Sequence, residues 1–147
     1  MLDRSGMCWQ RRSKLDGNNI DADARILLVD TIGELGAWWG TSHIAYVGGS
    51  MSRRGGQNPI EPSAYGAAVS FGPKTPNFRG VVAVLLDGDA AVVGRNGEQV
   101  REFVRKCLDE PQYAKQPGEN ARRHVHRQPA ACQPTTKMRL QPVQDEP

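Results

Sequence analysis

The stretch HIAYVGGSMSRRGGQNPIEP, residues 43–62, runs from a short apolar segment through a glycine-rich loop into a helix start. A continuous apolar run such as 43–49 is typical of a strand buried on both faces of a parallel sheet. Asn58 is a favourable N-cap, Pro59 suits the first helical position, and Glu61 is placed to complete a capping box. The stretch therefore predicts a strand, a loop and a helix in that order.

Similar apolar runs, each bounded by Gly or Asp, lie on both sides of this stretch. They are ARILLVD (24–30), AAVSFG (67–72) and AAVVG (90–94). Helical patterns separate them, and in NGEQVREFVRKCLDE (96–110) apolar residues recur at helical spacing opposite a charged face. This alternation predicts an α/β layer fold with a parallel sheet and right-handed crossovers.

The two ends of the chain fit this pattern less well. In residues 1–23 only MCWQ (7–10) resembles a strand, and the remainder reads as a polar loop. Residues 113–128 predict a helix, or a helix pair broken at Pro117. Residues 129–147 are proline-rich with few apolar residues and predict a frayed tail. The predicted divisions are thus 1–23, 24–128 and 129–147.

Composition narrows the class of protein. A chain of 147 residues is long enough for one core, and its net charge of +3 is spread along the sequence, which does not indicate nucleic-acid binding. The three cysteines are odd in number, far apart and without CxxC spacing, so they predict neither a disulfide framework nor a zinc site. We expect no metal. The absence of a membrane-length apolar run or signal peptide favours a cytoplasmic location.

The glycine-rich loop is the first candidate site. Its glycines lie where a parallel strand delivers the chain to a helix, which is the edge of the sheet where such folds bind ligands. Glycines admit a ligand to the backbone, and a helix start favours an anion such as phosphate. Glu61 would repel phosphate, so we expect it to accept hydrogen bonds from hydroxyls such as those of a ribose. The pattern favours a nucleotide or nucleotide sugar, with a plain tight connection as the alternative.

Two further loops follow predicted strands. VDTIGEL (29–35) is either a strand end with Asp30 or Thr31 as helix cap, or a second binding loop beside the first. In FGPKTPNF (71–78), Lys74 is within reach of a bound phosphate. No loop matches GxxxxGK[ST] or GxGxxG, so no dinucleotide cofactor is expected.

Taken together, residues 27–80 closely resemble the C-terminal domain of bacterial Kdo transferases, the glycosyltransferases that add 3-deoxy-D-manno-oct-2-ulosonic acid to a lipid A precursor. The motifs that carry the resemblance are D-T-x-G-E-L (30–35), G-G-S (48–50) and G-G-x-N-P-x-E (55–61). The similarity extends outward to WQRRSKLDG (9–17) and to about GENARRHV (118–125).

The resemblance implies a GT-B architecture of two Rossmann-like domains, of which this chain is a partial parallel sheet with flanking helices from the C-terminal half. That half binds the donor CMP-Kdo, with no metal or organic cofactor. By match to the family motifs, the implied CMP contacts are Ile32, Gly33, Glu34, Asn58, Pro59, Ile60 and Glu61. Possible further contacts in the loop are Gly49, Ser50, Gly56 and Gln57.

The family also has an N-terminal domain that carries the acceptor site for the lipid A precursor, the general base and usually a membrane anchor. No counterpart of that domain, or of the Pro-Arg pair that helps hold CMP, is present in these residues. We therefore expect a donor-binding part that is inactive alone and meets the acceptor and the membrane surface only through the other domain. The alternatives are a non-enzymatic remnant or interaction module that keeps the nucleotide loops, and a different nucleotide-sugar transferase of the same architecture.

Overall fold

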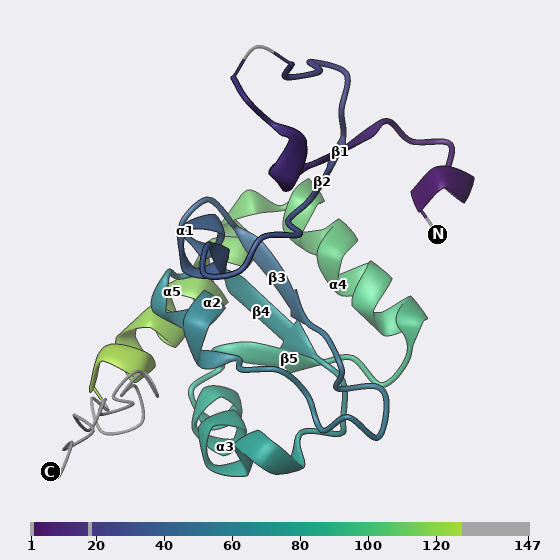
Figure 1. Ribbon diagram of the computed structural model, residues 1–147. Coiled ribbons are helices and arrows are strands. Elements are labelled where there is room, and N and C mark those ends of the chain that lie inside the picture. Colours follow the sequence, from purple (N-terminus) through teal and green to yellow (C-terminus); the bar gives the residue numbers. More distant parts are fainter. Residues whose placement is uncertain (1, 18, 128–147) are drawn as a thin grey trace, which may run out of the picture. The chain divides into compact units, whose positions relative to one another are not determined.

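The computed structural model describes residues 2–17 and 19–127 (Figure 1). The chain forms two compact units, of which the first ends at Thr41 and the second begins at Ser42. The predicted divisions at residues 23 and 128 stay predictions, and the predicted tail at 129–147 lies outside the described residues.

The first unit contains a pair of short strands. β1 (Trp9–Arg11) and β2 (Ile26–Leu28) are parallel, with Trp9 opposite Ile26 and Arg11 opposite Leu28. The predicted strands at 7–10 and 24–30 are thus confirmed. The other elements of this unit are the 3-10 helices η1 (Leu2–Arg4) and η2 (Arg12–Lys14) and the short helix α1 (Leu35–Trp39).

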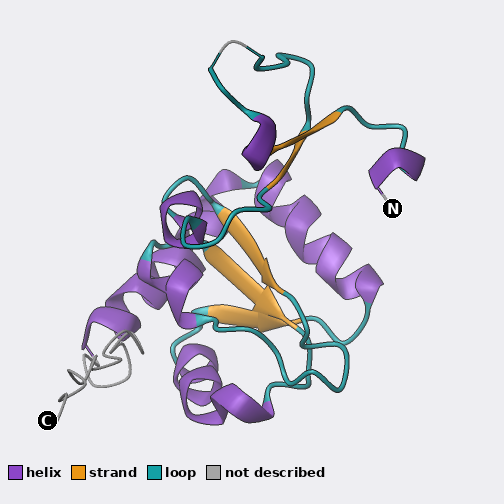
Figure 2. Ribbon diagram, viewed as in Figure 1, coloured by secondary structure: helices purple, strands orange, loops and turns teal. Residues whose placement is uncertain are grey.

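The second unit is built on three parallel strands in the order β3-β4-β5 (Figure 2). These are β3 (Ile44–Val47), β4 (Ala68–Phe71) and β5 (Ala91–Val93), which confirm the strands predicted at 43–49, 67–72 and 90–94. The strands are connected by α2 (Ile60–Ala64) and by η3 (Pro76–Phe78) with α3 (Arg79–Asp87), and α4 (Gly97–Asp109) and α5 (Pro111–Arg127) follow the last strand. The parallel α/β class is as predicted.

The core of the second unit surrounds β4, whose four residues are all buried. Ala68 of this strand packs with Phe103 and Cys107 of α4. The N-terminal cap and the apolar spacing of α4 both favour a helix at these residues. The Asn96 side chain accepts a hydrogen bond from the Gln99 backbone N–H at 2.9 Å, and the apolar face has the predicted helical spacing. Burial raises the pKa of the Cys107 thiol, which favours its neutral form.

Of the two alternatives predicted for this segment, the single helix is confirmed and the break at Pro117 is not, because α5 is one continuous helix that contains this proline. Pro117 removes one helical hydrogen bond, at a local energetic cost. The next residue, Gly118, packs so closely on the second unit's core that a Cβ there would collide with the carbonyl oxygen of Gly66. Ala121 and Val125 continue the same buried face. We infer that this packing outweighs the local cost of the proline.

The packing predicts a large loss of stability on truncating the aromatic residue of α4. Phe103 is 5% exposed, so Phe103→Ala should lower the free energy of unfolding by about 3–5 kcal/mol through lost burial and a new cavity. Leu108→Ala in the same helix is the control, since Leu108 is 66% exposed and its change should stay within about 0.5 kcal/mol. Urea denaturation measures both. Equal losses would contradict the assignment of the core.

Candidate functional site

The candidate site of the second unit is built from loops at the carboxyl edge of its sheet. Residues 48–59 follow β3 and residues 72–75 follow β4, and because the strands are parallel and adjacent these loops leave the sheet at the same edge. The first loop closes on itself where the Gln57 N–H donates to the Gly48 carbonyl at 3.0 Å. The loop therefore leaves β3 and returns to nearly the same point before α2 begins.

Ser50 joins the two loops. Its fully buried hydroxyl donates to the Val47 carbonyl at 2.6 Å and accepts from the Gly72 N–H at 2.7 Å. The Lys74 N–H then donates to the Ser50 carbonyl at 2.9 Å. A Cβ on Gly72 would lie 2.5 Å from that carbonyl oxygen, so only glycine fits there. The Ser50 hydroxyl is thus engaged inside the protein and positions the loops.

The adjacent glycines of the first loop allow protein loops to approach each other. Gly56 is buried with a φ of +82°, a conformation that side chains rarely adopt. A Cβ on Gly55 would lie 2.7 Å from the Asn77 side-chain nitrogen. The sequence predicted that such glycines leave the backbone open to a ligand. In the described structure these two are covered by the neighbouring loop, whereas Gly49 is half-buried and Gln57 is exposed.

The four residues Asn58–Glu61 form the start of α2. The Asn58 side-chain oxygen accepts from the Ile60 N–H at 3.0 Å, so Asn58 does cap this turn, although the helix begins only at Ile60. The predicted capping box differs, since Glu61 accepts from the Asn58 side-chain amide at 3.3 Å. Glu61 is exposed, whereas Pro59 is buried. Because α2 has five residues, a phosphate here would be bound by loop backbone and amide groups rather than by a long helix dipole.

In the first unit, Glu34 is held by two partners. The Arg12 guanidinium binds both carboxylate oxygens, with Nε 2.9 Å from Oε2 and Nη2 3.0 Å from Oε1. The Thr31 hydroxyl donates to Oε2 at 3.0 Å. No sequence motif marks the role of Arg12, because this partner lies 22 residues from Glu34. Next to Glu34, Gly33 has a φ of +88° and Ile32 is fully exposed. These residues belong to the first unit and Asn58–Glu61 to the second, so a shared CMP site stays a prediction.

The alternative in which Asp30 caps a helix is not found, because α1 begins at Leu35. The Asp30 carboxylate accepts from the Ser13 N–H at 2.9 Å and from the Ser13 hydroxyl at 2.8 Å, with Arg11 at 3.4 Å. The Ser13 backbone hydrogen bond is the largest cause that holds the pKa of Asp30 below its ordinary value. Asp30 thus ties β2 to η2 within the first unit.

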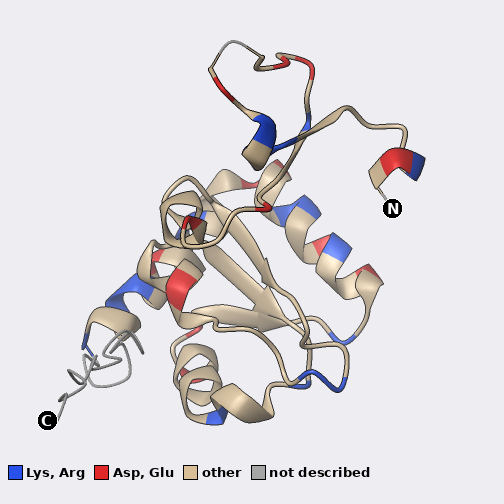
Figure 3. Cartoon of the chain, in the orientation of Figure 1, with Lys and Arg blue, Asp and Glu red and all other residues tan. Residues whose placement is uncertain are grey.

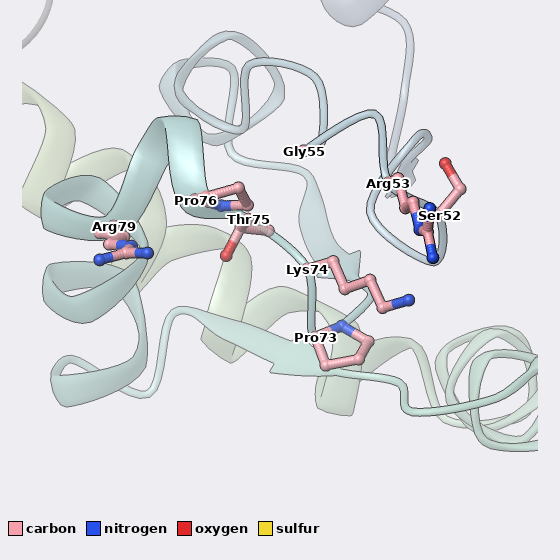
Figure 4. Close-up of a pocket in the computed structure, with 8 residues that line it drawn as sticks. All are labelled: Ser52, Arg53, Gly55, Pro73, Lys74, Thr75, Pro76 and Arg79. Atoms are coloured by element: carbon pink, nitrogen blue, oxygen red, sulfur yellow. The ribbon is translucent and has the colours of Figure 1, made fainter.

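A cleft of about 390 Å³ opens between the two loops of the second unit (Figure 4). Three basic side chains line it, and no Asp or Glu does. Sequence analysis singled out Lys74 but missed Arg79, which no motif marks. The lining residues are Ser52, Arg53, Gly55, Pro73, Lys74, Thr75, Pro76 and Arg79.

Over residues 2–17 and 19–127, no three His, Cys, Asp or Glu side chains are grouped so as to hold a metal ion. Over the same residues, none of the helices combines the length and apolar character needed to cross a bilayer.

Comparison with known proteins gives consistent matches. A 3-deoxy-D-manno-octulosonic acid transferase of Bordetella pertussis is 34% identical over 113 residues, which are 75% of this chain and 26% of that protein. The transferase of the same description from Haemophilus influenzae is 40% identical over 65 residues, or 44% of this chain and 15% of that protein. The chain thus spans about a quarter or less of the length of these relatives. No family model matches the chain.

A solved structure covers more of the chain. The C-terminal CMP-Kdo binding domain of WaaA from Acinetobacter baumannii superposes with a TM-score of 0.76 at 30% identity, over 84% of this chain and 64% of that one.

The strands, flanking helices and edge loops define a parallel α/β domain of the glycosyltransferase type, which agrees with the fold class expected from the sequence. The chain is a homologue of the bacterial 3-deoxy-D-manno-octulosonic acid transferases and matches their C-terminal domain.

The junction at Ser50 gives a stability prediction. Ser50→Ala leaves the buried Gly72 N–H without its acceptor, so the free energy of unfolding should fall by about 1–3 kcal/mol. Ser52→Ala in the same loop is the matched control, because its exposed hydroxyl makes only longer local bonds of 3.2 and 3.3 Å. Chemical denaturation compares the two variants. A loss for Ser50→Ala no greater than that for Ser52→Ala would contradict the role of the junction.

The hydrogen bonds to Asp30 give a prediction on pH. The pKa of Asp30 is lowered in the folded state, so its bonds stabilise the fold above the unfolded-state pKa and are lost as the pH falls through the folded-state pKa. A carbon-13 NMR titration of the Asp30 carboxyl should give a pKa below the ordinary Asp value. Ser13→Ala should raise it, whereas Ser5→Ala should leave it unchanged. Ser13→Ala removes only the hydroxyl bond and keeps the backbone bond, so an unchanged pKa in this variant would refute the contribution of the Ser13 hydroxyl.

Proposed function

We propose that this chain binds the nucleotide sugar CMP-Kdo as the donor for Kdo transfer. The observation that carries the proposal is the match to the CMP-Kdo binding domain of WaaA, in fold and at 30% identity. The edge loops support it independently, because in parallel α/β domains ligands bind where such loops meet.

Glu61 is the best candidate to bind the ribose of CMP. Its carboxylate is exposed, and the Asn58 amide engages one oxygen and orients the group. The other oxygen can accept hydrogen bonds from ribose hydroxyls. Pro59 is buried and Ile60 half-buried, so we propose that these two residues shape the turn that presents Glu61.

The loop at residues 32–34 is the second proposed part of the nucleotide site. Ile32 is an apolar side chain left fully exposed, and Gly33 has open space where a Cβ would lie, so both are accessible to a ligand. Arg12 holds the Glu34 carboxylate in one orientation, which pre-organises it for a polar contact. In the glycine-rich loop, Gln57 and Gly49 are the accessible contacts, whereas Ser50 and Gly56 act by positioning the loop.

The complete reaction is the transfer of Kdo from CMP-Kdo to a lipid A precursor in lipopolysaccharide synthesis, on the cytoplasmic face of the inner membrane. In this proposal the chain supplies the donor half of a GT-B glycosyltransferase and holds the CMP leaving group. The acceptor site and the general base belong to the other half, so the chain alone is expected to bind the donor without transferring it.

Binding of CMP tests the proposal. Calorimetry should detect CMP binding to the chain, and Glu61→Gln should weaken it by about tenfold through loss of charge-assisted hydrogen bonds to the ribose. If the 2′-hydroxyl is the partner of Glu61, 2′-deoxycytidine 5′-monophosphate should bind the unaltered chain more weakly than CMP does. The Glu61→Gln variant should bind the two nucleotides with nearly equal affinity.

Glu102→Gln is the matched control for this substitution. It removes an exposed carboxylate from α4, which contributes none of the proposed CMP contacts, and should leave the affinity for CMP unchanged. Absence of CMP binding at millimolar concentration would contradict donor recognition by this chain, and equal affinities of Glu61→Gln and the unaltered chain would contradict the ribose contact.

A further inference from the structure

The cleft between the two edge loops is lined by positively charged side chains that are not among the proposed nucleotide contacts. Arg53, Lys74 and Arg79 bring three positive charges to its lining, and none of the residues Asn58–Glu61 lines it. Figure 3 shows basic residues on the loop after β3 and at the start of α3, the segments that supply Arg53 and Arg79. The cleft is thus a positively charged feature at the same sheet edge, distinct from the residues proposed to hold the nucleotide.

These three cations have no carboxylate partner within the part of the chain that the structure describes. The ion pairs there are formed by Arg11, Arg12, Arg101 and Lys115. In Figure 4 the Lys74 side chain extends toward Arg53 and Ser52, whereas Arg79 lies beyond Thr75 and Pro76. Uncompensated positive charges that line a cleft raise the local concentration of an anion and favour its binding.

The backbone under the cleft is fixed by the protein. The Lys74 N–H is bonded to the Ser50 carbonyl, and Gly55 packs against Asn77 and Pro76. The bases of the Arg53 and Lys74 side chains therefore keep their separation, so less order has to be imposed when an anion binds.

We propose that this cleft receives the carboxylate of the Kdo sugar. The inference rests on the proposed function, because CMP-Kdo is the ligand in the description of the matched domain. Kdo is an acid, so the donor carries a carboxylate besides its phosphate. Arg53 lies within the glycine-rich loop and Asn58–Glu61 follow that loop, so the cleft and these proposed nucleotide contacts belong to the same edge of the sheet. The planar Arg53 guanidinium can form two parallel hydrogen bonds to a carboxylate, and Lys74 adds a point charge.

The affinities for CMP and CMP-Kdo separate this inference from the proposed function. In the unaltered chain CMP-Kdo should bind more tightly than CMP. Lys74→Gln and Arg53→Gln should each weaken CMP-Kdo by about tenfold and leave CMP within about twofold. Arg105→Gln, which removes a positive charge from the exposed face of α4, is the control for net charge and should change neither affinity.

Each other outcome has a definite meaning. If Lys74→Gln weakens CMP and CMP-Kdo equally, the cleft binds the phosphate and the carboxylate assignment is overturned. If both cleft variants bind both ligands as the unaltered chain does, the cleft has no part in donor binding. If CMP binds but CMP-Kdo binds no tighter, the inference fails while the proposed function stands. If the unaltered chain binds neither ligand, the proposed function fails and the inference with it.

Discussion

The candidate site depends on the hydroxyl of Ser50. This buried group links the end of β3 to the first residue after β4, and the Ser50 carbonyl holds the backbone of Lys74. The close approach is possible only because residue 72 is glycine. The two edge loops therefore behave as one structural element. Residues that contact no ligand can in this way determine where the ligand-binding groups lie.

The strands could be predicted from the sequence because each signal is local and repeated. Apolar runs bounded by Gly or Asp mark strands buried on two faces, and all four apolar runs proved to be strands. Helix α4 was equally clear, since its cap and its apolar spacing lie within the helix itself. The sequence could not decide between one helix and a break at Pro117 for the opposite reason. The contact of Gly118 with Gly66 joins residues far apart in sequence, and a local rule for proline cannot include it.

The same distinction applies to the candidate site. The cap formed by Asn58 and its link to Glu61 span three residues, so sequence reasoning reached the residues involved. Sequence reasoning could not predict the ion pair of Arg12 with Glu34 or the hydrogen bonds from Ser13 to Asp30, because the partners lie 22 and 17 residues apart. The cleft is likewise assembled from two loops and a helix start. Sequence patterns thus predicted candidate contacts, whereas the tertiary structure shows which of these side chains already form hydrogen bonds or ion pairs within the protein.

The arrangement of the glycine-rich loop also explains how one segment could serve two parts of a donor. Its closing bond from Gln57 to Gly48 brings the chain back beside β3 before Asn58. The residues in between form a projection whose outer part carries Arg53 toward the cleft, while its base carries Asn58 and Glu61. An acidic sugar is bound by cations and ribose hydroxyls are bound by acceptors such as a carboxylate. Cations and carboxylates placed side by side would pair with each other instead of with the ligand. In the proposed binding mode, Arg53 in the outer part of the loop and Glu61 beyond its base assign the two kinds of group to separate parts of one segment.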